Sequence, residues 1–251
     1  MLVVISILGI LAALTVPALK NLGKSNAAAS ASRQLLDAVG HARQLAIANR
    51  TTVYMVFVPT NFWNNAVWLG SLTTAQLTAA TNLCDKQLSG YTFVSQGAVG
   101  DQPGQHAWHY LEPWHALPDG AFIAPWKFVS PAQSNTITAF NPGIPIYGFN
   151  TNSVPFPTAD APLAMLLLPS IAFNYLGQLT TDGQNPAGRD EYIPLASGSV
   201  YPALDPSSKT LQFNSPSVSE MPPGNSTNSA FNIVDIDPLT GRATLRFQQV
   251  Q

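Results

Sequence analysis

The stretch LLDAVGHARQLAIANRTTVYMVF, Leu35 to Phe57, decides the fold class, because a helical pattern changes into a strand pattern inside it. No proline occurs from Ala27 to Asn49, and good helix formers dominate that segment. From Thr51 to Val58 the residues are mostly β-branched or aromatic, which predicts a strand that ends at Pro59. The sequence therefore predicts a helix that leads directly into the first strand of a sheet.

One side of the predicted helix is apolar. Six apolar residues recur at helical spacing and form a stripe: Leu35, Leu36, Val39, Ala42, Ala46 and Ile47. The polar residues lie largely off this stripe: Arg33, Asp37, His41 and Gln44. We expect the helix to pack on the sheet through four of the apolar residues: Leu35, Val39, Ala42 and Ala46.

Upstream of this helix lies an uncharged apolar run, MLVVISILGILAALTVPAL, residues 1–19. As a helix it is long enough to cross a hydrocarbon core of about 30 Å. A cleaved signal peptide would need a basic n-region, which is missing, and a helix buried in a protein core is less suited to a run that is apolar on every face. We therefore expect a transmembrane half over residues 1–22, continued by an amphipathic half over residues 23–50.

Four residues of the apolar run are candidates for helix–helix packing. Gly9, Ala12 and Ala13 are small enough to let neighbouring helices approach closely. Pro17 removes one hydrogen bond of the helix and is expected to loosen or kink it.

Residues 51–251 are predicted to form a β-rich head with long loops. Strands are expected at Thr51–Val58, Tyr91–Ser95, Ala121–Ala124, Thr136–Phe140, Ile144–Phe149, Ala164–Leu168, Ile171–Tyr175, Glu191–Ile193, Ser199–Tyr201, Thr210–Phe213, Phe231–Ile236 and Ala243–Gln248. Leu72 to Leu83 has the pattern of a short helix. An insertion at about 61–131 holds all five tryptophans, which form either a core of their own or an exposed binding face.

Composition restricts the possible partners and chemistry. Charged residues make up 10% of the 251 residues and the net charge is -2, which gives no electrostatic reason to expect a nucleic-acid partner. The Asn-, Ser-, Pro- and Gly-rich remainder suits an extracytoplasmic β domain. Cys84 is the only cysteine, so an intrachain disulfide is impossible.

No catalytic, cofactor or metal site is predicted. His106, His109 and His115, with Asp101 and Glu112, are the only group with metal-like spacing. This segment also contains Pro103, Gly104 and Pro113, so it cannot be a helix that presents all these side chains on one face. Nucleotide-binding and hydrolase motifs are missing as well, and we expect neither an enzyme nor a cofactor.

Four segments resemble type IV pilins and the pseudopilins of type II secretion. The run LVVISILGILAALTVPAL is similar to the segment that follows the prepilin cleavage site in that family. Leu35 to Phe57 resembles the helix-to-strand passage of the H-type minor pseudopilins and their FimT-like relatives. Ile171 to Gln184 and Ile233 to Leu245 look like the late strands of the same family. The resemblance implies an α+β fold in which a long N-terminal helix, with a transmembrane half and an amphipathic half, packs on an antiparallel β-sheet head.

The resemblance also implies a function. The chain would be a pseudopilin, a structural subunit of a type II secretion or type IV pilus-like filament. Its partners would be other pseudopilins, in a homo- or hetero-oligomer, together with the inner membrane and the secretion or pilus assembly machinery. Its location would be the bacterial inner membrane, single-pass, with a periplasmic head that joins the filament after assembly.

Two alternatives remain open at the level of sequence. FimT-like relatives are linked to DNA uptake, but Lys209, Arg242 and Arg246 are the only basic candidates here and are too few to predict DNA as a partner. The other alternative is a membrane-anchored extracytoplasmic binding protein.

The start of the chain departs from the family pattern. That pattern has a short basic leader, a glycine, a cleavage site with phenylalanine after it and an acidic residue a few positions later. None of these precedes the apolar run here, and by alignment the acidic residue would fall just before Met1. We expect an in-frame upstream segment that encodes them.

Overall fold

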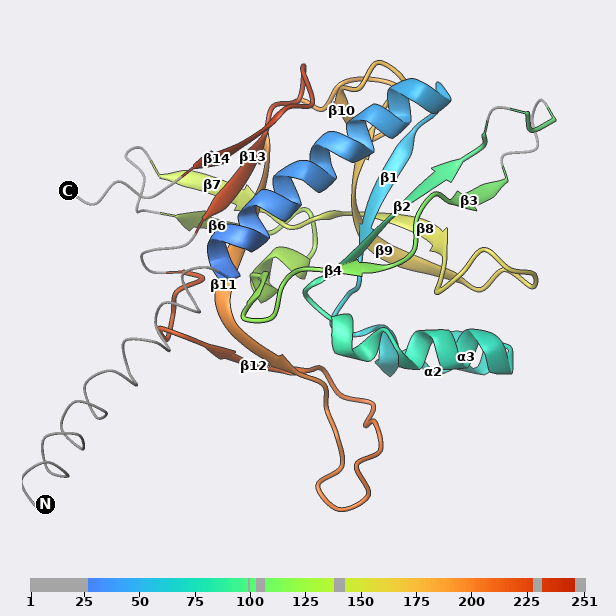
Figure 1. Ribbon diagram of the computed structural model, residues 1–251, viewed down its shortest axis with the longest axis vertical. Coiled ribbons are helices and arrows are strands. Elements are labelled where there is room, and N and C mark those ends of the chain that lie inside the picture. Colours follow the sequence, from blue (N-terminus) through green and yellow to red (C-terminus); the bar gives the residue numbers. More distant parts are fainter. Residues whose placement is uncertain (1–26, 99, 103–106, 138–142, 228–231, 247–251) are drawn as a thin grey trace, which may run out of the picture.

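The computed structural model describes residues 27–98, 100–102, 107–137, 143–227 and 232–246. Its first element is a helix of 23 residues, 27–49, shown in blue in Figure 1. The helix ends because Arg50 adopts a left-handed conformation with φ 50°, and Thr51 N–H then donates to the Ala46 carbonyl. The chain turns at this point and enters the first strand.

The larger sheet is antiparallel and seven-stranded. Its main path has the order β10-β9-β1-β2-β3, while β4 pairs with β2 and β8 pairs with β9. The strands are β1 (Val53–Phe57), β2 (Gly90–Gln96), β3 (Trp108–Tyr110), β4 (His115–Ala116), β8 (Asn150–Pro155), β9 (Met165–Phe173) and β10 (Leu179–Thr180).

A five-stranded antiparallel sheet and a two-stranded one complete the β structure. The five-stranded sheet has the order β12-β11-β13-β14, with β5 paired to β11, and the small sheet pairs β6 with β7. These strands are β5 (Ala121–Ile123), β6 (Ser134–Ile137), β7 (Ile144–Tyr147), β11 (Glu191–Tyr201), β12 (Ser217–Glu220), β13 (Ile233–Ile236) and β14 (Ala243–Arg246). Between β1 and β2 lie the short helices α2 (Ala66–Ser71) and α3 (Thr74–Thr81) and the 3-10 turns η1 (Phe62–Asn64) and η2 (Cys84–Lys86). A third 3-10 turn, η3 (Pro125–Phe128), lies between β5 and β6.

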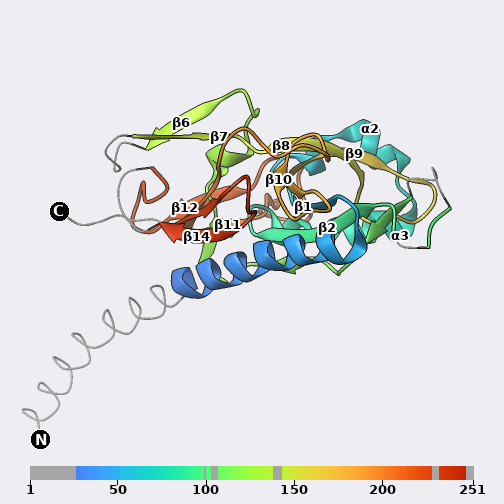
Figure 2. The same cartoon turned by 90° about the horizontal axis from the view of Figure 1, so that it is seen from above.

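The main core lies between the first helix and both larger sheets. Side chains of β1 alternate between its two faces, and Val53, Met55 and Phe57 face this core. Ile193 of β11 and Val234 of β13 belong to the same cluster. The helix therefore runs along one side of the molecule and covers parts of both sheets, as Figure 2 shows.

A second core lies on the other face of β1. Val56 and Val58 point into it and pack with Phe62, Trp68 and Phe156. Trp63, Trp108 and Trp114 pack against this cluster, while Trp126 packs with Ile146 and Ile233 in a smaller one. The tryptophans of the 61–131 insertion thus belong to internal clusters, and each contributes a large apolar area to them.

The predicted fold class is wrong. Instead of a long helix on one sheet head, the described chain is mostly antiparallel β structure, and its first helix has only 23 residues. The strands are divided between two larger sheets and a small hairpin sheet. The reason is that one helix stripe buries side chains of both larger sheets in a single core, so the fold is organised by sheets and not by the helix.

The predicted membrane location is also corrected. The predicted transmembrane half, residues 1–22, lies outside the described residues. Within the part of the chain that the structure describes, no helix has the length and apolar character needed to cross a membrane. This finding contradicts the single-pass inner-membrane localisation and the membrane assignments that go with it. The first helix is apolar on one side only, with Arg33, Asp37 and Gln44 exposed on the other.

Candidate functional site

The four helix residues predicted to contact the sheet are fully buried. Leu35, Val39, Ala42 and Ala46 are 0% exposed and belong to the main core cluster. The other predicted packing residues, Gly9, Ala12, Ala13 and Pro17, lie outside the described residues.

Hydrogen bonds fasten the first helix to both larger sheets. Near its start, Asn232, next to β13, donates to the Ser32 hydroxyl at 2.9 Å. Two residues further along, Gln34 Nε2 donates to the Tyr91 hydroxyl at 3.0 Å and to the Ala116 carbonyl at 2.8 Å. These contacts fix the N-terminal part of the helix to β13 of the five-stranded sheet and to β2 and β4 of the seven-stranded one.

The far end of the helix is fastened by Arg43. Its Nε donates to the Thr240 carbonyl at 2.8 Å and to the Gly177 carbonyl at 3.2 Å. Gly177 (φ 76°) lies in the β9–β10 turn, and a Cβ there would approach the Ile47 side chain to 2.7 Å. The left-handed backbone favours glycine at this position, and any larger residue would also have to displace the end of the Ile47 side chain.

The two described histidines of the segment with metal-like spacing, His109 and His115, contact different carboxylates. His109 Nε2 lies 2.8 Å from Asp101 Oδ2, and His115 Nε2 lies 2.9 Å from Glu112 Oε2. The second oxygen of Glu112 contacts His41 Nε2 of the first helix at 2.7 Å. His106 lies outside the described residues. Among the residues that the structure does describe, no group of three or more side chains could hold a metal ion.

A buried lysine forms an ion pair that the sequence did not reveal. Lys127 of η3 is 0% exposed, and its Nζ donates to Glu191 at the start of β11 and to the Tyr147 carbonyl of β7. Burial lowers the pKa of the Lys127 amine, and the negative charge of Glu191 opposes that shift. The pair connects η3, β7 and β11 in the interior.

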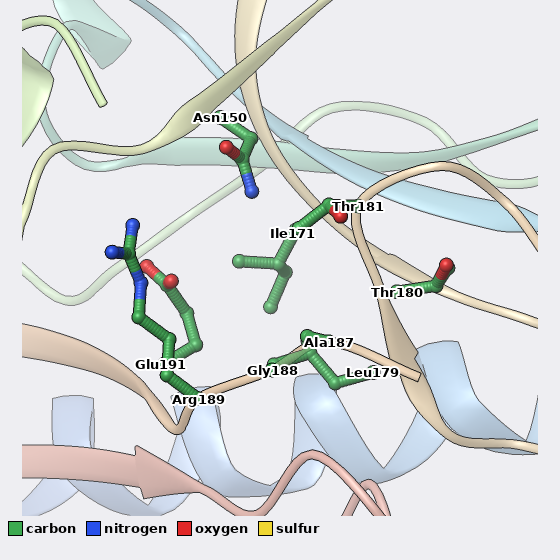
Figure 3. Close-up of a pocket in the computed structure, with 9 residues that line it drawn as sticks. All are labelled: Asn150, Ile171, Leu179, Thr180, Thr181, Ala187, Gly188, Arg189 and Glu191. Carbon is green, nitrogen blue, oxygen red and sulfur yellow. The ribbon is translucent and has the colours of Figure 1, made fainter. Parts of the chain in front are cut away.

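Next to this ion pair lies a partly enclosed cavity. It has a volume of about 340 Å³ and lies where β8, β9 and β10 of the larger sheet meet the start of β11. We call it the sheet-junction pocket. Figure 3 shows the nine side chains or backbone positions that line it: Asn150, Ile171, Leu179, Thr180, Thr181, Ala187, Gly188, Arg189 and Glu191.

The loop that closes one end of this pocket is a compact turn. Asp182 accepts hydrogen bonds from the Thr180 hydroxyl, from the backbone N–H groups of Gln184 and Asn185, and from the Asn185 amide. These bonds hold the pKa of Asp182 well below its usual range. The carboxylate is thus occupied with the turn itself, which explains the Asp-Gly-Gln-Asn sequence.

The basic residues considered for DNA do not gather on one surface. Lys209 lies in the loop before β12, at one edge of the five-stranded sheet, while Arg246 lies on β14 at the other edge. Arg246 Nε donates to Asp235 Oδ2 at 2.6 Å, so its charge is matched locally. Arg242 is exposed in the β13–β14 turn. This arrangement offers no continuous track for a phosphate backbone.

Comparison with known proteins identifies no relative. No protein-family model matches the chain, and neither the curated proteins nor the solved structures contain a match to it. The resemblance to type IV pilins therefore remains an interpretation of the four segments quoted above.

Proposed function

We propose that the protein is a structural subunit of a pilus-like filament, of the type IV pilus or type II secretion kind, that assembles through its apolar N-terminal segment. The described helix and sheets would form the head that this segment holds in place. Other subunits of the filament, identical or related, would be its partners.

One observation carries this proposal: the helix that follows the apolar segment in the sequence is attached at both ends to both larger sheets. Its buried stripe lies in the core shared by the sheets, and Ser32, Gln34 and Arg43 add polar contacts along its length. A force applied at the N-terminal end of the helix is therefore shared by both larger sheets and is not borne by a single strand. A subunit held in a filament by its N-terminal segment needs such a connection.

The sequence of the apolar segment supports the same function. Gly9, Ala12 and Ala13 would let identical helices approach closely in a bundle, where dispersion contacts between well-packed side chains accumulate. Pro17 would give that segment a point of local adjustment.

Sedimentation of the full chain tests the proposal. We expect the unmodified protein to form large assemblies, and Ala13→Phe to shift it toward the monomer because the larger ring separates neighbouring helices. Ala13→Ser, which keeps a small side chain at the same position, should assemble like the parent. Assemblies of Ala13→Phe equal to those of the parent, or a parent that stays monomeric at every concentration, would contradict the proposal.

A further inference from the structure

The sheet-junction pocket contains polar side chains that lack a hydrogen-bond or carboxylate partner among the described residues. Among the described residues, the side-chain amide of Asn150 has no hydrogen-bond partner, and the guanidinium of Arg189 has no carboxylate partner. Arg189 instead stacks on the ring of Tyr147, with its central carbon 3.6 Å from the ring centroid. Stacking restrains the orientation of the guanidinium while its N–H groups stay free to bind.

Glu191 adds a buried charge to the same wall. The residue is only 8% exposed, and its Oε1 is taken by Lys127, whose ammonium also donates to the Tyr147 carbonyl. In Figure 3 the polar ends of Asn150, Arg189 and Glu191 lie around the space next to Ile171. These three side chains come from the start of β8 and from the segment that begins β11.

The charge balance of the pocket favours an anion. Lys127 and Glu191 compensate each other within the protein, so the charge left over is that of Arg189. A planar guanidinium binds a carboxylate through two parallel hydrogen bonds, and a neighbouring amide N–H can add a third. A small carboxylate fits this donor set.

Apart from Thr180 and Thr181, the rest of the pocket is apolar, and the pocket is small. Ile171, Leu179 and Ala187 are all buried and form its floor. A volume of about 340 Å³ is at the lower end of the range of small-molecule pockets. The floor therefore suits a short branched aliphatic group and excludes a long chain.

We propose that the sheet-junction pocket binds a small carboxylate with a short aliphatic group, the carboxylate held by Arg189 and Asn150 and the aliphatic group by Ile171, Leu179 and Ala187. Two sources share this chemistry: a free short-chain acid and the C-terminal residue of a peptide. The proposal is independent of filament formation.

Ligand-observed NMR with the full chain tests the proposal. The probes are isovalerate, its neutral analogue isovaleramide, and the dipeptide N-acetyl-alanyl-leucine. We expect saturation transfer to isovalerate and none to isovaleramide, because only the acid supplies the anion for Arg189. Tighter binding of the dipeptide than of isovalerate would identify a peptide C-terminus as the source, and the reverse order would identify a free acid.

Substitutions in the pocket test whether the saturation-transfer signal comes from binding at this site. Arg189 is exposed at the surface, so Arg189→Gln should fold normally, and it should weaken isovalerate binding by about tenfold or more through the loss of a charged hydrogen-bonding pair. Asn150→Leu should weaken binding less, and Arg242→Gln, at an exposed arginine on another turn, should leave it unchanged. Equal signals from isovalerate and isovaleramide, unchanged affinity in Arg189→Gln, or no binding of either acid in the millimolar range would overturn the proposal.

Discussion

At the residue scale, Lys127 and Glu191 form a charge pair in the interior, and each depends on the other. Lys127 and Glu191 lie far apart in the sequence and meet where η3 passes the start of β11. Removing two charges from water is costly, and their mutual attraction recovers that cost only while both are present.

The pair therefore predicts a non-additive stability effect. Lys127→Met leaves the Glu191 carboxylate buried without compensation, and we expect a loss of about 3–5 kcal/mol in the free energy of unfolding. The double variant Lys127→Met/Glu191→Gln should recover much of this loss, because the buried negative charge is gone. Urea unfolding of the parent, both single variants and the double variant measures the coupling. A double variant whose loss equals the sum of the two single losses would contradict the account.

A second residue-scale prediction concerns acid sensitivity at Asp182. Its pKa is lower in the folded protein than in the unfolded chain, where it is about 3.9. The stability that it contributes is thus fully present above the unfolded pKa and is lost as the pH falls through the folded pKa. Asp182→Ala should melt at a lower temperature than the parent at neutral pH, and the difference should narrow as the pH falls below about 4.

Thermal melts at a series of pH values check this expectation. Asp119→Ala serves as the control because Asp119 is an exposed carboxylate outside that turn. A difference between Asp182→Ala and the parent that is constant from neutral to acidic pH would show that the turn does not depend on the ionised carboxylate.

At the scale of the element, the first helix is stable because one face is removed from water. Its polar face is exposed at Arg33, Asp37 and Gln44, whereas Leu35 and Val39 are fully buried. A helix of this length gains most of its stability from such packing and less from intrinsic propensity.

This predicts very different effects of the same new side chain at two positions. Val39→Asp places an unpaired carboxylate in the core between the helix and the sheets, and we expect it to destabilise the fold by several kcal/mol. Gln44→Asp adds the same charge at an exposed position of the same helix and should change stability by less than about 1 kcal/mol. Denaturant unfolding of the two variants checks this, and equal midpoints would mean that the helix does not dock as described.

Individual elements could be predicted where the side-chain pattern is local. The helix pattern from Ala27 to Asn49 and the strand pattern from Thr51 to Val58 correspond to helix 27–49 and to β1 at Val53–Phe57. Ala243–Gln248 likewise corresponds to β14 at Ala243–Arg246. In these segments one short stretch of sequence carries the whole periodic signal.

Local patterns fail where prolines interrupt a strand. Two separate strands were predicted on either side of Pro169, but β9 runs through it from Met165 to Phe173. Pro169 pairs with Thr151 of β8 and lies just outside the β1 ladder, which begins at Ser170. Pro194 likewise lies inside β11, at the point where this strand changes its pairing partner from β13 to β5. A proline is compatible with a strand at such changes of partner, and the sequence alone does not show where they occur.

At the scale of the whole molecule, the division into two larger sheets was not predictable from the sequence. It depends on pairings between distant segments, such as Val53 with Phe173 and Leu195 with Ile123. The sheet-junction pocket has the same origin, because Asn150, Ile171 and Glu191 reach it from three separate strands. Such sites follow from topology and not from a motif.

The arrangement of the head indicates which surface a filament would display. The first helix covers one face of β1, and the second core with α2 lies on the other face. Val67 of α2 is 87% exposed. A gold label attached to Val67→Cys would mark this surface selectively, because Cys84 is buried and burial raises the pKa of its thiol to about 12.

Electron microscopy of the labelled full chain tests the central claim most directly. If the protein is a filament subunit that assembles through its N-terminal segment, the images should show regular filaments with gold along their outer surface. Ala13→Phe should give isolated particles under the same conditions, and Ala13→Ser should give filaments. Isolated particles from the unmodified chain, irregular aggregates, or filaments that Ala13→Phe leaves unchanged would contradict the account.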